Sequence, residues 1–216
     1  NNKSDGTPYL MVGLADGLGS YDNKDGTITI LMNHELRSDR GIPREHNSTD
    51  PNGKGAFVSK WIVNKSDLTV IRGEDLIKTV KLWDAASDTF IESTNAIFNR
   101  FCAADLPERS AFYTKKGKKG YGGYLFMNGE EADGGRAFAH VVSGNEAGTS
   151  YELPSLGKIS WENAVASNYE QDKTIVIGLD DGEGIGKVLV YVGLKQKTGS
   201  PIEQAGLHGG TLYGIQ

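Results

Sequence analysis

The sequence has a single cysteine, six prolines and no apolar run near the ~20 residues that a membrane-spanning helix requires. With Cys102 alone, an intrachain disulfide is excluded. Positive charge is also scarce, because 23 Lys and Arg stand against 28 Asp and Glu and give a net charge of −5. The one basic cluster, at 115–119, is typical of a solvated hairpin tip. A nucleic-acid partner is therefore not expected, since phosphate binding needs concentrated Lys and Arg.

Glycine, in contrast, is abundant, with 29 residues. The glycines are scattered through tyrosine- and valine-rich runs, which favours many short strands joined by tight turns. The composition, 38% hydrophobic and 24% charged, is that of a chain that buries an ordinary core. We expect an all-β protein in which residues 1–216 form a single domain.

The apolar and β-branched runs predict where the strands lie. Asp16-Gly17 and residues 22–26 carry turn signals, 37–55 reads as a long surface loop, and 202–206 as a single helical turn. Residues 75–84 fit neither the helical nor the strand period, so both remain open there. The predicted strands are 9–13, 27–32, 56–63, 68–71, 120–127, 136–142, 174–179, 187–192 and 211–215.

Three of these strands stop at side chains of the type that ligate hard cations. Strand 27–32 ends at Asn33-His34-Glu35, strand 121–127 at Asn128-Gly129-Glu130-Glu131, and strand 174–179 at Asp180-Asp181-Gly182. A further short strand within 156–165 delivers Glu162 beside Trp161. Each motif alone could be a polar strand end, but in a radial fold such as a propeller equivalent strand ends converge at one end of the central channel. The sequence therefore predicts a metal site.

Cys102 lies between aromatic residues and an acid. A lone cysteine is most often a small buried apolar residue, unless a neighbour stabilises its thiolate. Arg100 could do so, and a metal ion would do so outright. His140 is interpreted as a hydrogen-bonded structural side chain.

Six motifs follow one another in a distinctive order and spacing. They are 13–23, Asn33-His34-Glu35, Arg100-Phe101-Cys102, 128–131, Trp161-Glu162-Asn163 and Asp180-Asp181-Gly182. Over about residues 11–216, this series resembles the PhoX-type alkaline phosphatases and their uncharacterised bacterial relatives. The resemblance implies a β-propeller, exported to the periplasm or outside the cell, with iron and calcium held at the channel mouth by a cysteine thiolate and carboxylates.

Carried across by motif, the resemblance assigns metal ligands and cofactors, Fe³⁺ and Ca²⁺. Glu35, Cys102 and Glu162 would correspond to iron-side ligands. Glu130 or Glu131, and Asp180 or Asp181, would correspond to calcium-side ligands. The family's later motif, with an Arg and a further acidic ligand, is expected beyond residue 216, and no catalytic residue is assigned here. Because 212–216 breaks off within a strand pattern, we expect the N-terminal portion of a propeller.

The first functional hypothesis is an exported metal-dependent phosphatase that hydrolyses small phosphomonoesters. The second is a non-enzymatic, calcium-stabilised extracellular propeller used for adhesion or surface scaffolding. A third is a hydrolase of similar architecture that acts on another ester, such as a lactone or phytate. All three share the same metal ligands, and the substrate would be chosen by loops such as 37–55.

Overall fold

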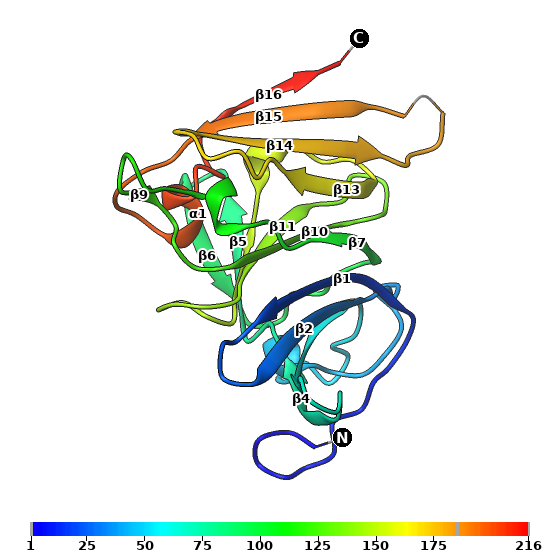
Figure 1. Ribbon diagram of the computed structural model, residues 1–216. Helices are drawn as coiled ribbons and strands as arrows, with labels where there is room; N and C mark the ends of the chain where they lie inside the picture. The colour runs from blue at the N-terminus through cyan, green and yellow to red at the C-terminus, as the bar shows by residue number, and fades with distance from the viewer. Residues whose placement is uncertain (1, 185, 216) are drawn as a thin grey trace.

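The chain folds almost entirely into β-strands, arranged as a stack of sheets (Figure 1). The computed structural model describes residues 2–184 and 186–215. Within these residues there are three larger sheets and one two-stranded ribbon, and none of them closes on itself. The first sheet lies at the N-terminal end of the stack, the third at the other end, and the second between them.

The first sheet is a four-stranded antiparallel meander. Its first two strands are joined by the hairpin turn predicted at residues 22–26, where Gly26 takes a positive φ of 87°. A long excursion, 37–55, containing the short helix η1 (Glu45–Asn47), connects its second and third strands. The strands are β1 (Ala15–Asp22), β2 (Thr27–His34), β3 (Phe57–Asn64) and β4 (Val70–Asp75).

The second sheet has the strand order β6-β5-β12-β11-β10-β7, in which only the β5–β12 pair is parallel. Its strands are β5 (Thr79–Asp84), β6 (Thr89–Ser93), β7 (Phe101–Asp105), β10 (Leu125–Glu130), β11 (Ala137–Val141) and β12 (Thr149–Glu152). The ribbon β8 (Tyr113–Thr114) and β9 (Lys119–Gly120) follows the short helix η2 (Arg109–Ala111).

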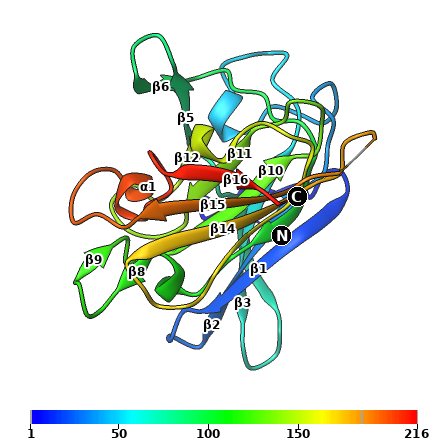
Figure 2. The same ribbon diagram turned by 90° about the horizontal axis from the view of Figure 1, so that it is seen from above.

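The third sheet is again an antiparallel meander, and it lies over the strands of the second sheet (Figure 2). The helical turn α1 (Pro201–Gln204) precedes its last strand, as predicted for 202–206, and η3 (Pro154–Leu156) leads into its first. Its strands are β13 (Trp161–Ala166), β14 (Lys173–Asp180), β15 (Val188–Leu194) and β16 (Thr211–Gly214). Among the described residues, none of the helices has the length and apolarity needed to span a bilayer.

Side chains from both faces of the second sheet form the core. Phe126 and Phe138 pack toward Leu31 and Val58 of the first sheet. Met127, the neighbour of Phe126 in β10, packs on the opposite face with Trp161 and Tyr191 of the third sheet. This alternation is the period of a strand buried on both faces. The second sheet is thereby packed between the first and the third.

Two glycines allow these sheets to approach closely. A Cβ at Gly17 of β1 would lie 2.5 Å from the backbone nitrogen of Ala104 in β7, and one at Gly129 of β10 would lie 2.3 Å from the Cβ of Trp161. Neither distance is compatible with a side chain. Glycine therefore sets the close spacing between β1 and β7 and between β10 and β13.

Several sequence predictions about the strands were wrong. The predicted strand 9–13 has no ladder partner, and Tyr9 instead donates a hydrogen bond to Asp75 and packs edge-on against Trp61. The predicted turn at Asp16-Gly17 lies inside β1, at an irregularity of the β1–β2 register. The predicted strand 120–127 begins only at Leu125 and continues to Glu130. At 75–84, where the sequence left helix and strand open, the structure has the strand β5, so this segment is no error.

Candidate metal centre

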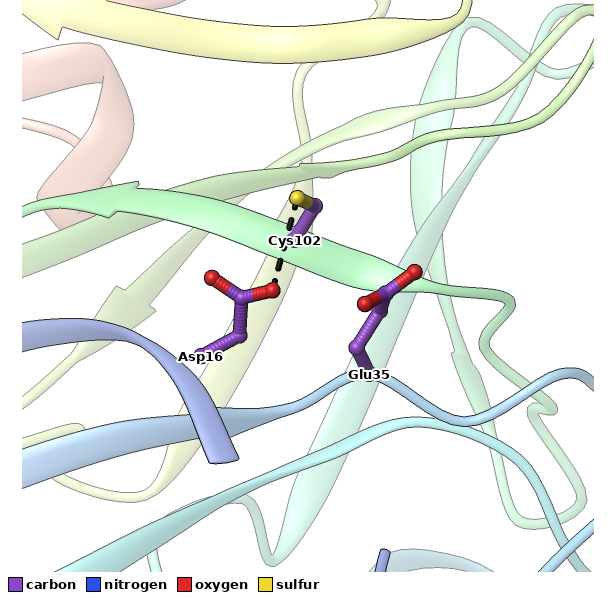
Figure 3. Close-up of side chains that lie close together, drawn as sticks. All are labelled: Asp16, Glu35 and Cys102. Carbon is purple, nitrogen blue, oxygen red and sulfur yellow. Dashed lines mark hydrogen bonds between the residues drawn. The ribbon is translucent and has the colours of Figure 1, made fainter. Parts of the chain in front are cut away.

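Acidic side chains from all three sheets converge around the thiol of Cys102. Asp16 comes from β1, Glu35 directly follows β2, Cys102 is in β7, Glu131 directly follows β10, and Glu162 is in β13. Figure 3 shows the carboxylates of Asp16 and Glu35 on the first-sheet side of Cys102. These positions are far apart in the sequence, and the stacking of the sheets brings them to one place.

The five side chains form two groups that share the cysteine. Ligand atoms of Asp16, Glu35 and Cys102 all lie within 4.8 Å of one another, and so do those of Cys102, Glu131 and Glu162. Two atoms on a cation with bonds of ~2.0–2.6 Å can be at most about twice that length apart, so both groups are compact enough to share an ion. The thiol stands where the two groups meet.

One cation, the guanidinium of Arg100, reaches into this cluster. Its Nε donates to Glu35 Oε1 at 2.9 Å, and its Nη2 lies 2.6 Å from Glu131 Oε1. Arg100 has a positive φ of 49°, which is uncommon for a residue with a side chain and often marks a functional site. Arg100 thus bridges one carboxylate from each of the two groups.

The thiol of Cys102 is held protonated by its surroundings. Burial, a hydrogen bond with Glu131 and the negative charge of Asp16 raise the pKa of Cys102 well above its usual range. The thiol itself donates to Asp16 Oδ2 at 3.5 Å. The hypothesis that Arg100 stabilises a thiolate was wrong, because its guanidinium binds Glu35 and Glu131 instead.

Glu162 is partly buried among other carboxylates. Burial and then the carboxylates of Glu131, Asp181, Asp16 and Glu35 raise the pKa of Glu162 above its ordinary value. The single guanidinium therefore leaves a surplus of carboxylates. A thiol with several carboxylates and too little positive charge is a donor set that fits bound cations.

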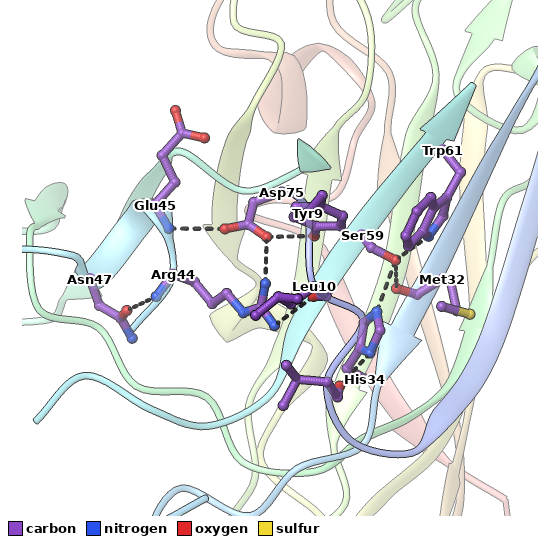
Figure 4. Close-up of polar contacts among 11 residues, drawn as sticks. Tyr9, Leu10, Met32, His34, Arg44, Glu45, Asn47, Ser59, Trp61 and Asp75 are labelled. Atoms are coloured by element: carbon purple, nitrogen blue, oxygen red, sulfur yellow. Dashed lines mark hydrogen bonds and ion pairs between the residues drawn. The ribbon is translucent and has the colours of Figure 1, made fainter. Parts of the chain in front are cut away.

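The strand end that carries Glu35 is fixed by the buried residue His34 (Figure 4). Its Nδ1 lies 2.7 Å from the carbonyl oxygen of Val12, its Nε2 lies 2.9 Å from Ser59 Oγ, and its ring stacks on Phe57. Burial lowers the pKa of His34 to about 4, so the ring is neutral at pH 7. Both ring nitrogens are in use, so His34 positions Glu35 and is no ligand.

A second set of buried contacts in Figure 4 anchors the long loop 37–55. Asp75 accepts hydrogen bonds from Tyr9 Oη at 2.6 Å and from the backbone nitrogen of Glu45 at 3.0 Å. Arg44 Nη1 lies 3.4 Å from the same carboxylate, and its guanidinium covers the Phe57 ring at 3.5 Å. The loop is therefore tied to the first sheet at its midpoint.

Two buried amides position the backbone of Cys102. Asn33 Nδ2 donates to the carbonyl oxygens of Cys102 at 2.9 Å and Ala103 at 3.1 Å. Asn128 Nδ2 donates to Asn33 Oδ1, and His140 Nε2 lies 2.9 Å from Asn128 Oδ1. The interpretation of His140 as a hydrogen-bonded structural side chain is confirmed.

The remaining predicted ligands have other surroundings. Glu130 forms a two-pronged ion pair with Arg136, with Nε–Oε2 and Nη2–Oε1 distances of 2.7 and 2.8 Å, and also accepts from the backbone nitrogens of Asn99 and Arg136. Asp180 Oδ1 accepts from two backbone nitrogens, and its Oδ2 lies 3.6 Å from Lys187 Nζ. Asp181 is exposed, and its charge acts on Glu162. Of the two predicted pairs, only Glu131 belongs to the two groups of ligand atoms around Cys102, and neither Asp180 nor Asp181 does.

Sequence reasoning assigned no individual role to Asp16, Asn33 or Asn128, although all three lie in motifs that it singled out. Asp16 precedes a glycine, and that dipeptide is a strong turn signal. Here Gly17 serves the approach of β7 to β1 instead. Asn33 and Asn128 stand in motifs that the sequence did single out, so their positions carried a signal although their supporting role did not.

Among the comparisons with known proteins, only the comparison of structures found a match. No protein-family profile and no curated protein sequence matches the chain. Its structure is similar to that of Pseudomonas fluorescens PhoX in complex with vanadate, a transition state analogue, with a TM-score of 0.53 and 11% identity. The match covers 94% of this chain and 45% of that one, so the chain spans less than half the length of the solved structure. The expected fold, all-β and corresponding to part of a propeller, is confirmed.

Proposed function

We propose that the protein is a metal-dependent phosphatase acting on phosphomonoesters. The observation that carries the proposal is the cluster itself: four carboxylates and a thiol, drawn from three sheets, with one guanidinium among them. The fold similarity to PhoX, which was solved with a transition state analogue, supports it. As in that family, we also propose an exported, periplasmic or extracellular location.

The donor atoms suggest which cations the two groups would hold. The groups share Cys102, so a thiolate with carboxylates, a set suited to Fe³⁺, is available to both, and the carboxylates of Asp16, Glu35, Glu131 and Glu162 also offer the oxygen ligands that suit Ca²⁺. When bound, such cations supply charge neutralisation for the phosphate oxygens during hydrolysis.

The protein's own residues prepare the site for these cations. Cys102 must release its proton to bind as a thiolate, and Asp16 Oδ2 is the acceptor already in contact with the sulfur. Glu35 and Glu131, which Arg100 binds in this structure, would hold the cations with part of their oxygen atoms. Asn33 and Asn128 keep the backbone of Cys102 in place while this occurs.

The proposal is tested by elemental analysis of protein purified without chelator or metal-affinity resin, together with hydrolysis of 4-nitrophenyl phosphate. We expect iron with calcium, and loss of both the iron and the hydrolysis in Glu162→Gln. Glu92→Gln, at an exposed position of β6, is the matched control and should leave both unchanged. Calcium alone, without hydrolysis, would support the scaffold hypothesis instead, and absence of both metals would refute a metal centre.

A further inference from the structure

Next to the cluster is a surface hollow of about 360 Å³ in which three arginines meet. We propose that this hollow binds a second anionic group of the substrate, so that the substrate class is phosphomonoesters carrying a further carboxylate or phosphate. The inference rests on the proposed phosphatase function and names its substrate class. The hollow is lined by Leu14, Glu35, Leu36, Arg37, Arg40 and Arg100.

The hollow is built by a turn that is tied to the metal-site strand. The turn is closed by the hydrogen bond from Arg40 N to Arg37 O at 2.9 Å. Ser38 N donates to Asn99 Oδ1 at 3.2 Å, and Arg100 N donates to Leu36 O at 2.8 Å. These bonds hold the turn against the segment that leads into Cys102. The backbone of the two arginines of the turn therefore keeps a defined position relative to the cluster.

Two of the three guanidinium groups are available to a ligand. Arg100 is engaged with Glu35 and Glu131. Arg40 has only a pair with Asp39 at 3.6 Å, in which both side chains are about 70% exposed, and such pairs contribute little. Arg37 is exposed and has no ion pair with any residue in 2–184 or 186–215.

The guanidinium groups of the hollow favour an anion. Its lining has three guanidinium groups and one carboxylate, and the carboxylates of Glu131 and Asp39, outside the lining, pair with Arg100 and Arg40. Arg37 is the guanidinium that remains without a carboxylate partner within the described residues. A planar guanidinium binds carboxylate or phosphate through two parallel hydrogen bonds, which gives direction as well as attraction.

The position of Glu35 links the hollow to the reacting group. Glu35 belongs both to the lining of the hollow and to the cluster with Asp16 and Cys102. A substrate whose phosphate lies at the cluster would thus extend across Glu35 toward the turn. Leu14 and Leu36 offer apolar contact to a short carbon spacer between the two anionic groups.

The test compares two phosphonates that differ at one end, propylphosphonate and 3-phosphonopropionate, neither of which has an ester bond to hydrolyse. Calorimetric titration of metal-loaded protein should give binding about tenfold tighter for the compound with the carboxylate, a difference of ~1.4 kcal/mol. In Arg37→Gln/Arg40→Gln this ratio should fall to about one, with the metal content and the affinity for propylphosphonate unchanged. Arg109→Gln/Lys115→Gln removes the same charge at the far end of β1, near Tyr21 and Asp22, and should retain the ratio.

A ratio near one in the unaltered protein, or a ratio that survives in the Arg37/Arg40 variant, would overturn the inference while leaving the phosphatase proposal intact. If the affinity ratio were also lost in the control variant, the preference for the carboxylate would come from the net charge of the protein, and the inference would again be overturned. If the protein takes up no metal and binds neither compound, the proposed function fails, and the substrate class fails with it.

Discussion

At the scale of single residues, Glu130 and Glu131 show how neighbours with the same chemistry differ in surroundings. Glu130 is buried, and four donors from Arg136 and Asn99 satisfy its two oxygens. Glu131 lies among the carboxylates near Cys102 and contacts Arg100. Sequence alone could not separate them, because the strand period places neighbours on opposite faces but does not say which face meets the cluster.

Glu130→Gln is therefore expected to destabilise the fold. Removing one partner of a buried ion pair leaves the other charge uncompensated and costs about 3 kcal/mol or more. Urea denaturation of the metal-free protein should report this loss. Glu131→Gln is the matched comparison. It should lower the metal content of the protein while lowering the unfolding free energy less than Glu130→Gln does. Equal stability losses in the two variants would contradict the separation of roles.

Cys102→Ser tests the thiol as an iron ligand. An iron-bound thiolate gives a ligand-to-metal absorption in the visible range, which an oxygen ligand in its place would not reproduce. We expect the serine variant to lose the iron and the colour and to retain its calcium. The unfolding free energy of the metal-free variant should change by only about 1 kcal/mol, as for a single modest substitution. Wild-type iron content in this variant would make Cys102 an ordinary partly buried thiol.

At the scale of strands, the sequence was informative where a run is long and β-branched. Runs 27–32 and 174–179 were predicted as strands, and both are strands in the structure. In β14, buried residues alternate with more exposed ones, whereas the second half of β2 is buried throughout. Strand β7 was not predicted, since Phe101–Asp105 is short and pairs with β10 across a register irregularity. Residues 9–13 have the composition of a strand but no ladder partner, and a local pattern does not encode the partner.

The sequence likewise identified some residues of the candidate site and missed another. Glu35, Cys102 and Glu162 were identified from their motifs, and the structure brings them into the two groups around the thiol. Asp16 was not identified, because its role depends on β7 lying against β1. That contact is made between residues 86 positions apart and leaves no local signature.

Gly17→Ala probes the approach of β1 to β7 directly. The new Cβ would lie 2.5 Å from Ala104 N, so a strand must shift, at a cost of about 1–3 kcal/mol for overpacking. Because Asp16 is adjacent, metal affinity should fall as well. Gly122→Ala is the matched control, since its Cβ would meet nothing within 4 Å. Thermal unfolding of both variants with and without metal measures the two effects, and equal behaviour would contradict the packing argument.

At the scale of the whole molecule, the stack of sheets buries neutral histidines, and these make the stability of the fold depend on pH. Burial lowers the pKa of His46 to about 4 and that of His140 to about 3. In the unfolded chain each titrates near 6.5. Between these values the unfolded state binds more protons, so stability rises with pH there and is lost as pH falls from about 6.5.

We therefore expect the unfolding free energy to decrease between pH 6.5 and 5 by up to about 1.4 kcal/mol per pH unit for each buried histidine. Urea denaturation at a series of pH values measures the slope. His46→Leu should reduce the slope of unfolding free energy against pH by the contribution of one histidine. The substitution removes no side-chain hydrogen bond, because neither ring nitrogen of His46 has a partner within the described residues. An identical slope in the variant would show that His46 is not among the responsible groups.

Removal of metal should also act on the whole stack. The clustered carboxylates repel one another without cations, and a bound cation stabilises the native state by ~2.7 kcal/mol at a hundredfold excess over its dissociation constant. Exhaustive dialysis against EDTA should therefore lower the melting temperature, and added calcium should restore part of it. An unchanged melting curve after confirmed metal loss would separate the cluster from the stability of the fold.

Because the cluster draws on all three sheets, it also has an order of assembly in time. Glu162 is made sixty residues after Cys102, which at about 5–20 residues per second is a delay of roughly 3–12 s. During that interval Asp16, Glu35 and Cys102 can already lie together, while Glu162 has not yet been synthesised. A complete ligand set thus exists only after the third sheet has docked, so an ion captured during synthesis would be held by the first group of ligands alone. Under the proposed function, complete metal loading would be a late event in the life of the polypeptide, and it would mark chains whose sheets have finished stacking.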